Sequence, residues 1–570
     1  MCMRIKRSYI EAGIFIAVYL FAIYVWTLPF QDNRTPYGEW DAISHWELGD
    51  FIAQYDQTFV YLPGFLDYSY GGDNNYKPHT LWYHPPFHTD FAIISAFSND
   101  RMVPIFLTNA IFASAILISV FFVINRLFGF LPAILSSFML TFSMRDILPY
   151  LWGQWPERFA YAFIPLVLYC FYMYYISYSR EKNKPIYLYI MSLLLAINVF
   201  IHPLVFFHTL IGIFVLGVTL AIKLRKMPFN LKHISIFLLL FLVLFAVFPY
   251  QTGNVIVSFT KSSTPEESKY PLISRLLQWA PNPRDFVGSV PGTYFSFEQM
   301  IGYWGFLDDS KSQGINSDSP FFKKLSVNIT NLLFIFLVIG IAILFLRKEQ
   351  RDIFLLAWLI SLYLVLHRDL IGKFTFLHRS LSATAHIFIP IIVIGALSIS
   401  SLIKIPKMYR SLLKYVIAVL IVAFTLMYNM PFAFSTLDNA YNSPLIRLNP
   451  AQIEVSEWLK DNIPEDRNVS IIGTPEQLDK KVWWMASYSH RVSHYFEGFF
   501  TWSSEDEETK QRIASGHLLS DYVVFDYSDI ALLSDRSFVE RWLEFEQRNM
   551  ANHTLLYNKD NMKVYKYESS

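Results

Sequence analysis

The sequence predicts an α-helical, polytopic membrane protein with a small α/β domain at its C-terminal end. Of its 570 residues, 54% are hydrophobic and only 16% are charged, which is more apolar surface than a soluble chain of this length can bury. The apolar residues gather in about eleven runs of membrane-spanning length, and basic residues occupy every second loop between them. After the last run the composition changes to one helical and several short β-like patterns.

The first apolar run, residues 9–30, follows Arg4, Lys6 and Arg7 and has the outline of a signal peptide. It is long for the apolar part of a signal peptide, and no small-residue cleavage site follows, so we expect an uncleaved first span. The other spans are expected at residues 103–125, 127–148, 159–178, 186–202, 203–222, 233–250, 326–346, 352–367, 381–402 and 411–433.

The positively charged loops determine the expected orientation. Basic residues precede the first run and follow the second, fourth, sixth, eighth and tenth, and such residues are enriched on the cytoplasmic side of membranes. We therefore expect a multi-pass protein of the plasma or cell membrane with a cytoplasmic N-terminus. The predicted domains are a transmembrane domain, 1–433, with large outer loops at 31–102 and 251–325, and an extracytoplasmic α/β domain, 434–570.

The net charge and the motif content exclude several classes of protein. The formal net charge is +1, so no basic field indicates binding to nucleic acid. The two cysteines, Cys2 and Cys170, are too few for a disulfide framework. A phosphate-binding loop, a dinucleotide fingerprint and a nucleophile elbow are all missing from the sequence, which argues against an enzyme driven by a nucleotide.

The first outer loop begins with an acidic and aromatic stretch, GEWDAISHWELGDF. Asp41 and His45 are four residues apart, so a helix there places both on one face, and Glu39 adds a second acid. A carboxylate beside a hydroxyl can take its proton, which makes Asp41 the candidate general base, with Glu39 or His45 tuning or orienting it. The alternative is a solvated acidic loop anchored by its aromatic residues. In either case we expect Glu47 and Asp50 to be solvated.

The same loop closes with the stretch YHPPFHTDFAII, which brings His84 and His88 close to a pair of prolines. These two histidines are candidates for lining an acceptor or donor groove. The apolar residues that follow recur at helical spacing and can lie in the membrane interface; they are Phe87, Phe91, Ile94 and Phe97.

These motifs resemble the GT-C superfamily of membrane glycosyltransferases, which use lipid-linked sugar donors. WDAISH is similar to the Asp-x-x-x-His pattern of several branches, including oligosaccharyltransferase catalytic subunits. YHPPFHTDFAII resembles the end of this loop in the protein O-mannosyltransferase and lipid A aminoarabinose transferase branches. GQWPERFAYAFIPLVLY, from Gly153 to Tyr169, resembles a loop-to-helix pattern of archaeal and bacterial members. The resemblance implies a GT-C-like fold and an inverting transfer of sugar from polyprenyl phosphate to an extracytoplasmic lipid, glycan or protein.

A donor of this kind needs cations beside its phosphate. The segment HRDLIGKFTFLHR supplies Arg368, Lys373, His378 and Arg379 on the side where positive charge is scarce, and Arg379 resembles an arginine at such helix starts in the superfamily. The alternative is that these side chains reach the lipid headgroups.

Further candidates are more weakly indicated. Arg158 and Glu157 end the short outer loop 145–158 and are candidates for the same groove. His202 lies beside Pro203 at the outer end of a span, where it lines a groove or caps a broken helix. Carboxylates suit Mg²⁺ or Mn²⁺, and a metal would be held by Asp41, Glu39 and Asp146; no cofactor is certain, because only some branches of the superfamily require a cation.

Three other functions remain open from the sequence. The first is transfer of a whole oligosaccharide, but the tail has Trp483 and Trp484 followed by Met485, where oligosaccharyltransferases have a Trp-Trp-Asp-Tyr-Gly motif that reads the acceptor. The second is a transporter of lipid-linked substrates, although the sequence has no internal repeat. The third is a non-catalytic protein of envelope assembly.

Overall fold

The computed structural model describes residues 7–32, 34–37, 40–55, 85–228, 230–246, 320–366, 380–403, 406–440, 447–464, 467–472, 478–495, 521–530 and 537–567. The chain divides into two compact units. The helical unit comprises Met1–Leu28, Leu107–Tyr150 and Gln154–Ala440. The mixed unit comprises Pro29–Phe106, Leu151–Gly153 and Tyr441–Ser570, so it joins the first outer loop to the C-terminal tail.

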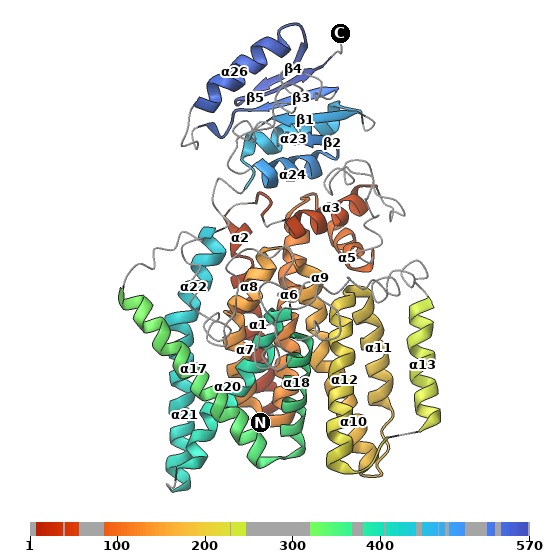
Figure 1. Ribbon diagram of the computed structural model, residues 1–570, viewed down its shortest axis with the longest axis vertical. Coiled ribbons are helices and arrows are strands. Elements are labelled where there is room, and N and C mark those ends of the chain that lie inside the picture. The colour runs from red at the N-terminus through yellow and green to blue at the C-terminus, as the bar shows by residue number, and fades with distance from the viewer. Residues whose placement is uncertain are drawn as a thin grey trace, which may run out of the picture. The chain divides into compact units, whose positions relative to one another are not determined.

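Long apolar helices make up the helical unit (Figure 1). They are α1 (Arg7–Trp26), α6 (Val103–Phe128), α7 (Phe130–Thr141), α8 (Met144–Leu151), α9 (Trp155–Tyr161), α10 (Phe163–Ser179), α11 (Ile186–Ile201), α12 (Pro203–Leu224), α13 (Leu231–Ala246), α17 (Pro320–Arg347), α18 (Gln350–Leu366), α20 (Thr384–Leu402), α21 (Lys407–Phe424) and α22 (Met430–Ser435). A 3-10 turn, η5 (Leu381–Ala383), precedes α20, and π-helical turns, η6 (Thr425–Asn429) and η7 (Thr436–Ala440), flank α22. Each of the about eleven predicted runs is therefore occupied by one helix or by consecutive ones.

Membrane-spanning length is reached by 6 helices in the described part of the chain, or by 7 segments if α7 and α8, bent by 40° at their junction, form one span. These helices leave large apolar side chains uncovered by protein, as α12 does with Phe214 and Ile222, exposed by 70% and 75%. Such surfaces are covered by lipid rather than by water. The chain is an integral membrane protein, as predicted.

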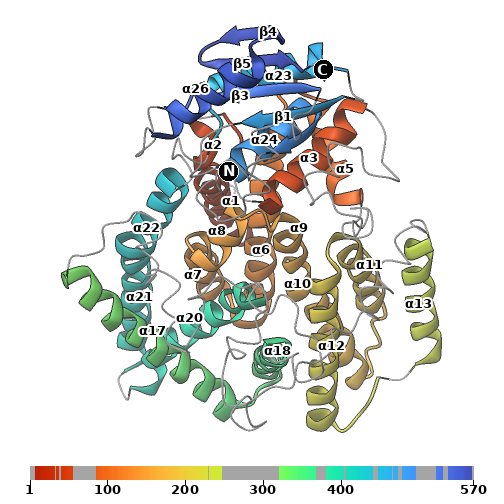
Figure 2. The same cartoon turned by 45° about the horizontal axis from the view of Figure 1, so that its top comes forward.

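Neighbouring helices pack through apolar side chains that point between them. The helices α10, α11 and α12 lie alongside one another (Figure 2) and share a core that includes Val167, Leu195, Val199 and Phe206. Because lipid offers no hydrogen bonds, the helical conformation satisfies the backbone of each span internally. This packing explains why the sequence is apolar on all faces of these segments.

The mixed unit is built on one five-stranded sheet with the order β2-β1-β3-β5-β4 (Figure 1). Its strands are β1 (Asn468–Ile472), β2 (Val492–Tyr495), β3 (Tyr522–Asp526), β4 (Thr554–Lys559) and β5 (Met562–Lys566). The strand β1 pairs in parallel with β2 and β3, whereas β5 pairs antiparallel with β3 and β4. The predicted α/β character of the tail is confirmed.

The helices of the mixed unit are α2 (Leu28–Gln31), α3 (Trp40–Tyr55), α5 (Pro85–Ser95), α23 (Pro450–Asn462), α24 (Leu478–Ser489) and α26 (Ser537–Met550). The helix α23 begins at Pro450, and a reciprocal pair of hydrogen bonds between Asn449 and Gln452 caps it. Helices from both parts of the sequence, α3 from the loop and α24 from the tail, pack together in this unit.

Candidate functional site

Asp41 lies in the first turn of α3 and is half-buried. The helix places Asp41 and His45 one turn apart on the same face, as predicted. Residues 42–52 are buried, so exposure of this helix is concentrated at its first and last turns. The amide groups at a helix N-terminus stabilise negative charge, which suits a carboxylate at this point. Glu39 lies outside the described residues.

The first turn of α3 is held by a close backbone approach from Gly153. A Cβ atom at Gly153 would overlap the backbone of Asp41 and Ala42, and the φ angle of +91° is one that side chains rarely allow. Gly153 is the first residue of the GQWPERF segment, whose role in the fold was not evident from the sequence. Only glycine therefore fits this contact with the turn that carries Asp41.

His45 pairs with a histidine from the end of the same loop. Its Nδ1 lies 2.9 Å from Nε2 of His88, and both side chains are 1% exposed. One of these two nitrogens donates its proton and the other accepts it, so the accepting ring is neutral. Gly49 of α3 allows the side chain of Phe91 to approach closely from α5. His45 and His88 are thus brought together, whereas His84 lies outside the described residues.

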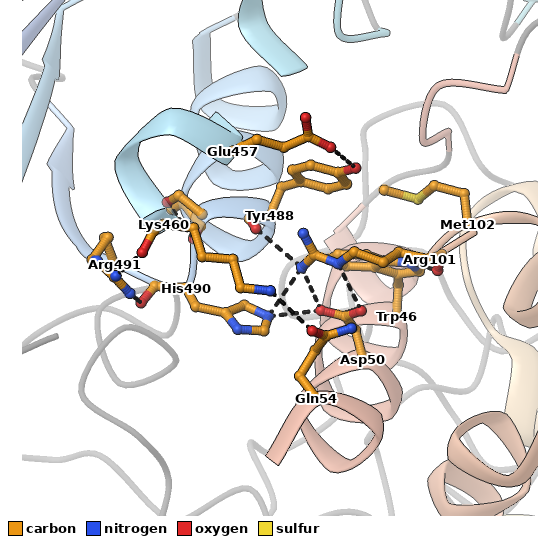
Figure 3. A network of polar contacts seen from close by, with 12 residues as sticks. Trp46, Asp50, Gln54, Arg101, Met102, Glu457, Lys460, Tyr488, His490 and Arg491 are labelled. Carbon is orange, nitrogen blue, oxygen red and sulfur yellow. Dashed lines mark hydrogen bonds and ion pairs between the residues drawn. The ribbon is translucent and has the colours of Figure 1, made fainter. Parts of the chain in front are cut away.

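The expectation that Glu47 and Asp50 are solvated is wrong. Glu47 is fully buried and Asp50 is 1% exposed. Asp50 forms an ion pair with Arg101 and a hydrogen bond with His490 (Figure 3), two residues that the sequence did not single out. Burial raises the pKa of Glu47 well above its ordinary value, and the charge of Asp50 adds to this increase. The helix packs against α5 and α24, where Asp50 is paired and burial favours the neutral form of Glu47.

A second group of charged residues is buried among the spans of the helical unit. Asp146 from α8 accepts hydrogen bonds from Arg158 Nη1 of α9 and from His386 Nε2 of α20, each at 2.7 Å. Arg158 also donates to the hydroxyl of Ser382. These side chains are buried. Burying a charge inside a membrane protein costs free energy, so such charges are usually paired with one another or take part in function. We call Asp146, Arg158 and His386 the membrane triad.

Tyr161 connects the membrane triad to further polar residues. Its ring centre lies 4.7 Å from the guanidinium carbon of Arg158, and its hydroxyl donates to Glu157 Oε1 at 2.9 Å. Its ring also contacts those of His386 and His208. The predicted groove residues Arg158 and Glu157 therefore belong to one buried polar cluster. His208 was not predicted to be part of it; a histidine inside an apolar run is the signal that could have indicated it.

His202 lies where the chain passes from α11 to α12. It ends α11, with φ of −156° and ψ of +115°, and Pro203 begins α12. The backbone amide of His202 donates to the carbonyl of Asn198 at 3.1 Å. This position fits the capping alternative and does not test a role in binding.

Several predicted residues fall outside the described part of the chain. They are Glu39, His84, Arg368, Lys373, His378 and Arg379, together with residues 251–319 of the second large outer loop. Of the metal candidates that are described, Asp41 belongs to the mixed unit and Asp146 to the helical unit. In the described residues, no three His, Cys, Asp or Glu side chains are grouped as metal ligands, so we derive no step through a metal.

Comparison with solved structures finds similar chains among membrane-bound transferases. The oligosaccharyltransferase of Archaeoglobus fulgidus in its apo form covers 92% of this chain and 70% of its own, with a TM-score of 0.56 and 14% identity. A second match is AglB, the archaeal oligosaccharyltransferase of A. fulgidus in complex with an inhibitory peptide and a dolichol-phosphate. It covers 98% of this chain and 74% of its own, with a TM-score of 0.54 and 12% identity. ArnT from Cupriavidus metallidurans bound to undecaprenyl phosphate covers 97% of both chains, with a TM-score of 0.50 and 10% identity.

Both kinds of protein are GT-C superfamily members. The chain has the GT-C fold. TM-scores of 0.50–0.56 establish this fold, and identities of 10–14% leave the activity to be argued from the residues. No protein-family model and no curated protein matches the sequence. The GT-C fold confirms the fold class that the sequence predicts.

Proposed function

We propose that the chain is an integral membrane glycosyltransferase that transfers a sugar from a polyprenyl-phosphate-linked donor to an acceptor outside the cytoplasm. The GT-C fold supports this reaction class. AglB was solved with a dolichol-phosphate and ArnT with undecaprenyl phosphate, which supports a lipid phosphate as the donor's carrier. Such a donor stores its activation in the sugar–phosphate bond, in agreement with a sequence that lacks nucleotide-binding motifs.

The observation that carries the proposal is the membrane triad. Arg158 Nε and Asp146 Oδ2 are buried and make no hydrogen bond to the described residues, although both atoms can form one. A buried ionic cluster that served stability alone would have its polar atoms satisfied. We assign the triad, with Glu157 and Tyr161, to the groove that binds polar parts of the donor or acceptor.

In the proposed reaction, Asp41 takes the proton of the acceptor hydroxyl while the oxygen of that hydroxyl attacks C1 of the sugar. The bond from C1 to the phosphate oxygen breaks, its electron pair goes to the lipid phosphate, and the configuration at C1 is inverted. Arg379, helped by Arg368, Lys373 and His378, binds the phosphate as negative charge develops on it. Glu39 or His45 orients Asp41. The N-terminus is cytoplasmic in this arrangement, and the tail is on the acceptor side.

The test is transfer of a labelled sugar from polyprenyl phosphate by purified protein in lipid nanodiscs, scored as product formation or donor hydrolysis. Asp41→Asn keeps the size of the side chain and removes the base, so we expect transfer to fall by on the order of 10²–10⁴-fold. Asp32→Asn is the matched control, because Asp32 is an exposed acid near the start of the same loop. Near-normal activity of Asp41→Asn would remove Asp41 from the mechanism.

A second candidate is transfer of a whole oligosaccharide, which the match to two oligosaccharyltransferase structures favours. The tail argues against reading of an acceptor motif at the tryptophan pair. Trp484 and Met485 are fully buried inside α24, so they present no surface to a peptide. Lipid-linked oligosaccharide and a sequon peptide, offered together to the same nanodiscs, decide between the two: glycopeptide formation would favour this second function.

A further inference from the structure

The C-terminal tail contacts the helix that carries the proposed base through a buried ionic cluster (Figure 3). Asp50 of α3 accepts two hydrogen bonds from Arg101, from Nε at 3.1 Å and from Nη2 at 2.6 Å. His490, directly after α24 in the tail, contacts Asp50 Oδ2 through Nε2 at 2.7 Å. The same Nη2 of Arg101 donates to the carbonyl oxygen of Tyr488 at 3.1 Å. We call Asp50, Arg101 and His490 the tail triad.

The tail triad contains an ion pair that stays charged at neutral pH. Although burial opposes ionisation, Arg101 and His490 hold the pKa of Asp50 well below its ordinary value, so this carboxylate stays charged. Burial lowers the pKa of His490 below its ordinary value, with Asp50 opposing that effect only in part. The cluster at neutral pH is therefore an Asp50–Arg101 ion pair with a neutral imidazole donating to it.

Aromatic packing surrounds the tail triad and supplies most of the apolar contact. The guanidinium carbon of Arg101 lies 4.2 Å from the ring centre of Tyr488 and 5.5 Å from that of Trp46. Trp46 of α3 also packs on Trp484 and Tyr488 of α24. Flat aromatic contacts of this kind tolerate sliding and rotation, whereas a two-pronged ion pair accepts one geometry. The ion pair therefore fixes α3 against Arg101, and the tail binds this pair through His490 and the carbonyl oxygen of Tyr488.

Helical geometry connects this contact to the proposed base. Asp41 and Asp50 are nine residues apart, which is two and a half turns, so their side chains leave α3 on opposite faces about 13 Å apart along the axis. A tilt of about 5° around Asp50 thus moves Asp41 by roughly 1 Å. Misplacement of a reacting group by 1 Å can cost about 10²-fold in rate. The tail contacts the face with Asp50, and Asp41 lies on the opposite face in the first turn, where it is half-buried.

We infer that Asp50, Arg101 and His490 are positioning residues, through which the C-terminal tail holds α3 and thereby Asp41 in place for transfer. This inference rests on the proposed function for the role of Asp41. It makes the tail a working part of the catalytic unit. Gly153 fixes the first turn of α3, and the tail triad fixes its second half.

The experiment compares Arg101→Met, Arg101→Lys and a control, Gln54→Ala, in nanodiscs. Gln54 lies one turn beyond Asp50, is exposed, and accepts a hydrogen bond from Lys460 of the tail at 3.0 Å. We expect Arg101→Met to lower kcat by about 10–100-fold with the KM for donor changed less than about threefold. Arg101→Lys keeps the charge and loses the two-pronged geometry, so it should recover part of the rate, and Gln54→Ala should match the wild type.

Amide exchange measured on the same samples separates this inference from the proposed function. Faster exchange in residues 40–55 of Arg101→Met, with residues 554–566 unchanged, supports the clamp. Unchanged exchange in α3, or a rise in KM with normal kcat, overturns it. If Arg101→Met does not fold, the same criteria apply to Arg101→Lys. An inactive wild type removes the proposed function, and the exchange result alone then decides whether Arg101 fixes α3.

Discussion

The two units of the chain each contain a buried cluster of one Asp, one Arg and one His. The two clusters differ in how many hydrogen-bonding atoms of the Asp and Arg side chains have a partner. In the tail triad, both oxygens of Asp50 accept hydrogen bonds, and Arg101 is engaged through Nε and Nη2. In the membrane triad, Arg158 and His386 both donate to the same oxygen, Asp146 Oδ1. The remaining Asp146 Oδ2 and Arg158 Nε make no hydrogen bond to the described residues.

This difference separates a structural role from a binding role. A buried ion pair stabilises a protein only when its remaining polar atoms are also satisfied, and the Asp50–Arg101 pair of the tail triad meets this condition. The membrane triad retains hydrogen-bonding capacity in a place where water and polar partners are scarce, which is a cost to folding. The same three residue types therefore act as a clamp in one unit and as a candidate binding site in the other.

The largest effect that would test this comparison is on activity. Arg158→Met removes a guanidinium from the proposed groove, and we expect the initial rate of sugar transfer to fall by on the order of 10³-fold. Arg101→Met should lose less, about 10–100-fold, because it acts only through the placement of α3. Both rates are measured with the same labelled donor. A greater loss in Arg101→Met would reverse the roles assigned to the two triads.

The losses in free energy of unfolding should rank in the opposite order, with the greater loss in Arg101→Met. Arg101→Met leaves Asp50 buried with only a neutral histidine beside it, so we expect the free energy of unfolding to fall by about 3–5 kcal/mol. Arg158→Met likewise leaves Asp146 buried beside a histidine, but it also relieves the cost of burying Arg158 Nε without a partner among the described residues, so we expect a smaller loss of about 1–3 kcal/mol. Thermal unfolding of both variants in one detergent provides the ranking. Equal losses would show that the membrane triad is as structural as the tail triad.

The sequence allowed the spans and the tail strands to be predicted because local rules determine them. Lipid requires about 20 consecutive apolar residues for a helix, and short apolar runs between turns mark strands. Asp41 at the start of a helix and the start of α23 at Pro450 were also accessible, since spacing and capping are local.

The partners of the buried charges could not be predicted in the same way. Asp50 contacts Arg101 at a separation of 51 residues and His490 at 440, and Asp146 contacts His386 at 240. Helical spacing gives no information about such pairs, so the sequence predicted that Asp50 was one more solvated acid of the loop. Gly153 was noticed only as part of a motif, because its contact with α3 depends on two segments meeting in space.

The smallest expected effect concerns Glu47, which lies one turn before Asp50 and takes no part in the clamp. Burial raises the pKa of its carboxyl, so the folded protein binds this proton to a higher pH than the unfolded chain does. The stability that Glu47 contributes is therefore complete below an unfolded pKa of about 4.3 and is lost as the pH rises towards the folded pKa. Glu47→Gln is neutral at every pH, and we expect it to stabilise the protein by on the order of 1 kcal/mol at pH 8 and by nothing near pH 4.

Thermal unfolding of Glu47→Gln and wild type between pH 4 and pH 8 measures this effect, with Asp32→Asn as the control for an exposed acid. The reverse trend, a variant that is less stable at pH 8 than the wild type, would mean that Glu47 is ionised and paired in the folded state. In that case α3 would carry a second clamp beside Asp50, and the tail would hold the helix through two charges. The sign of the change at pH 8 thus decides whether the tail triad alone determines the register of α3, because a neutral Glu47 forms no ion pair that could resist its rotation.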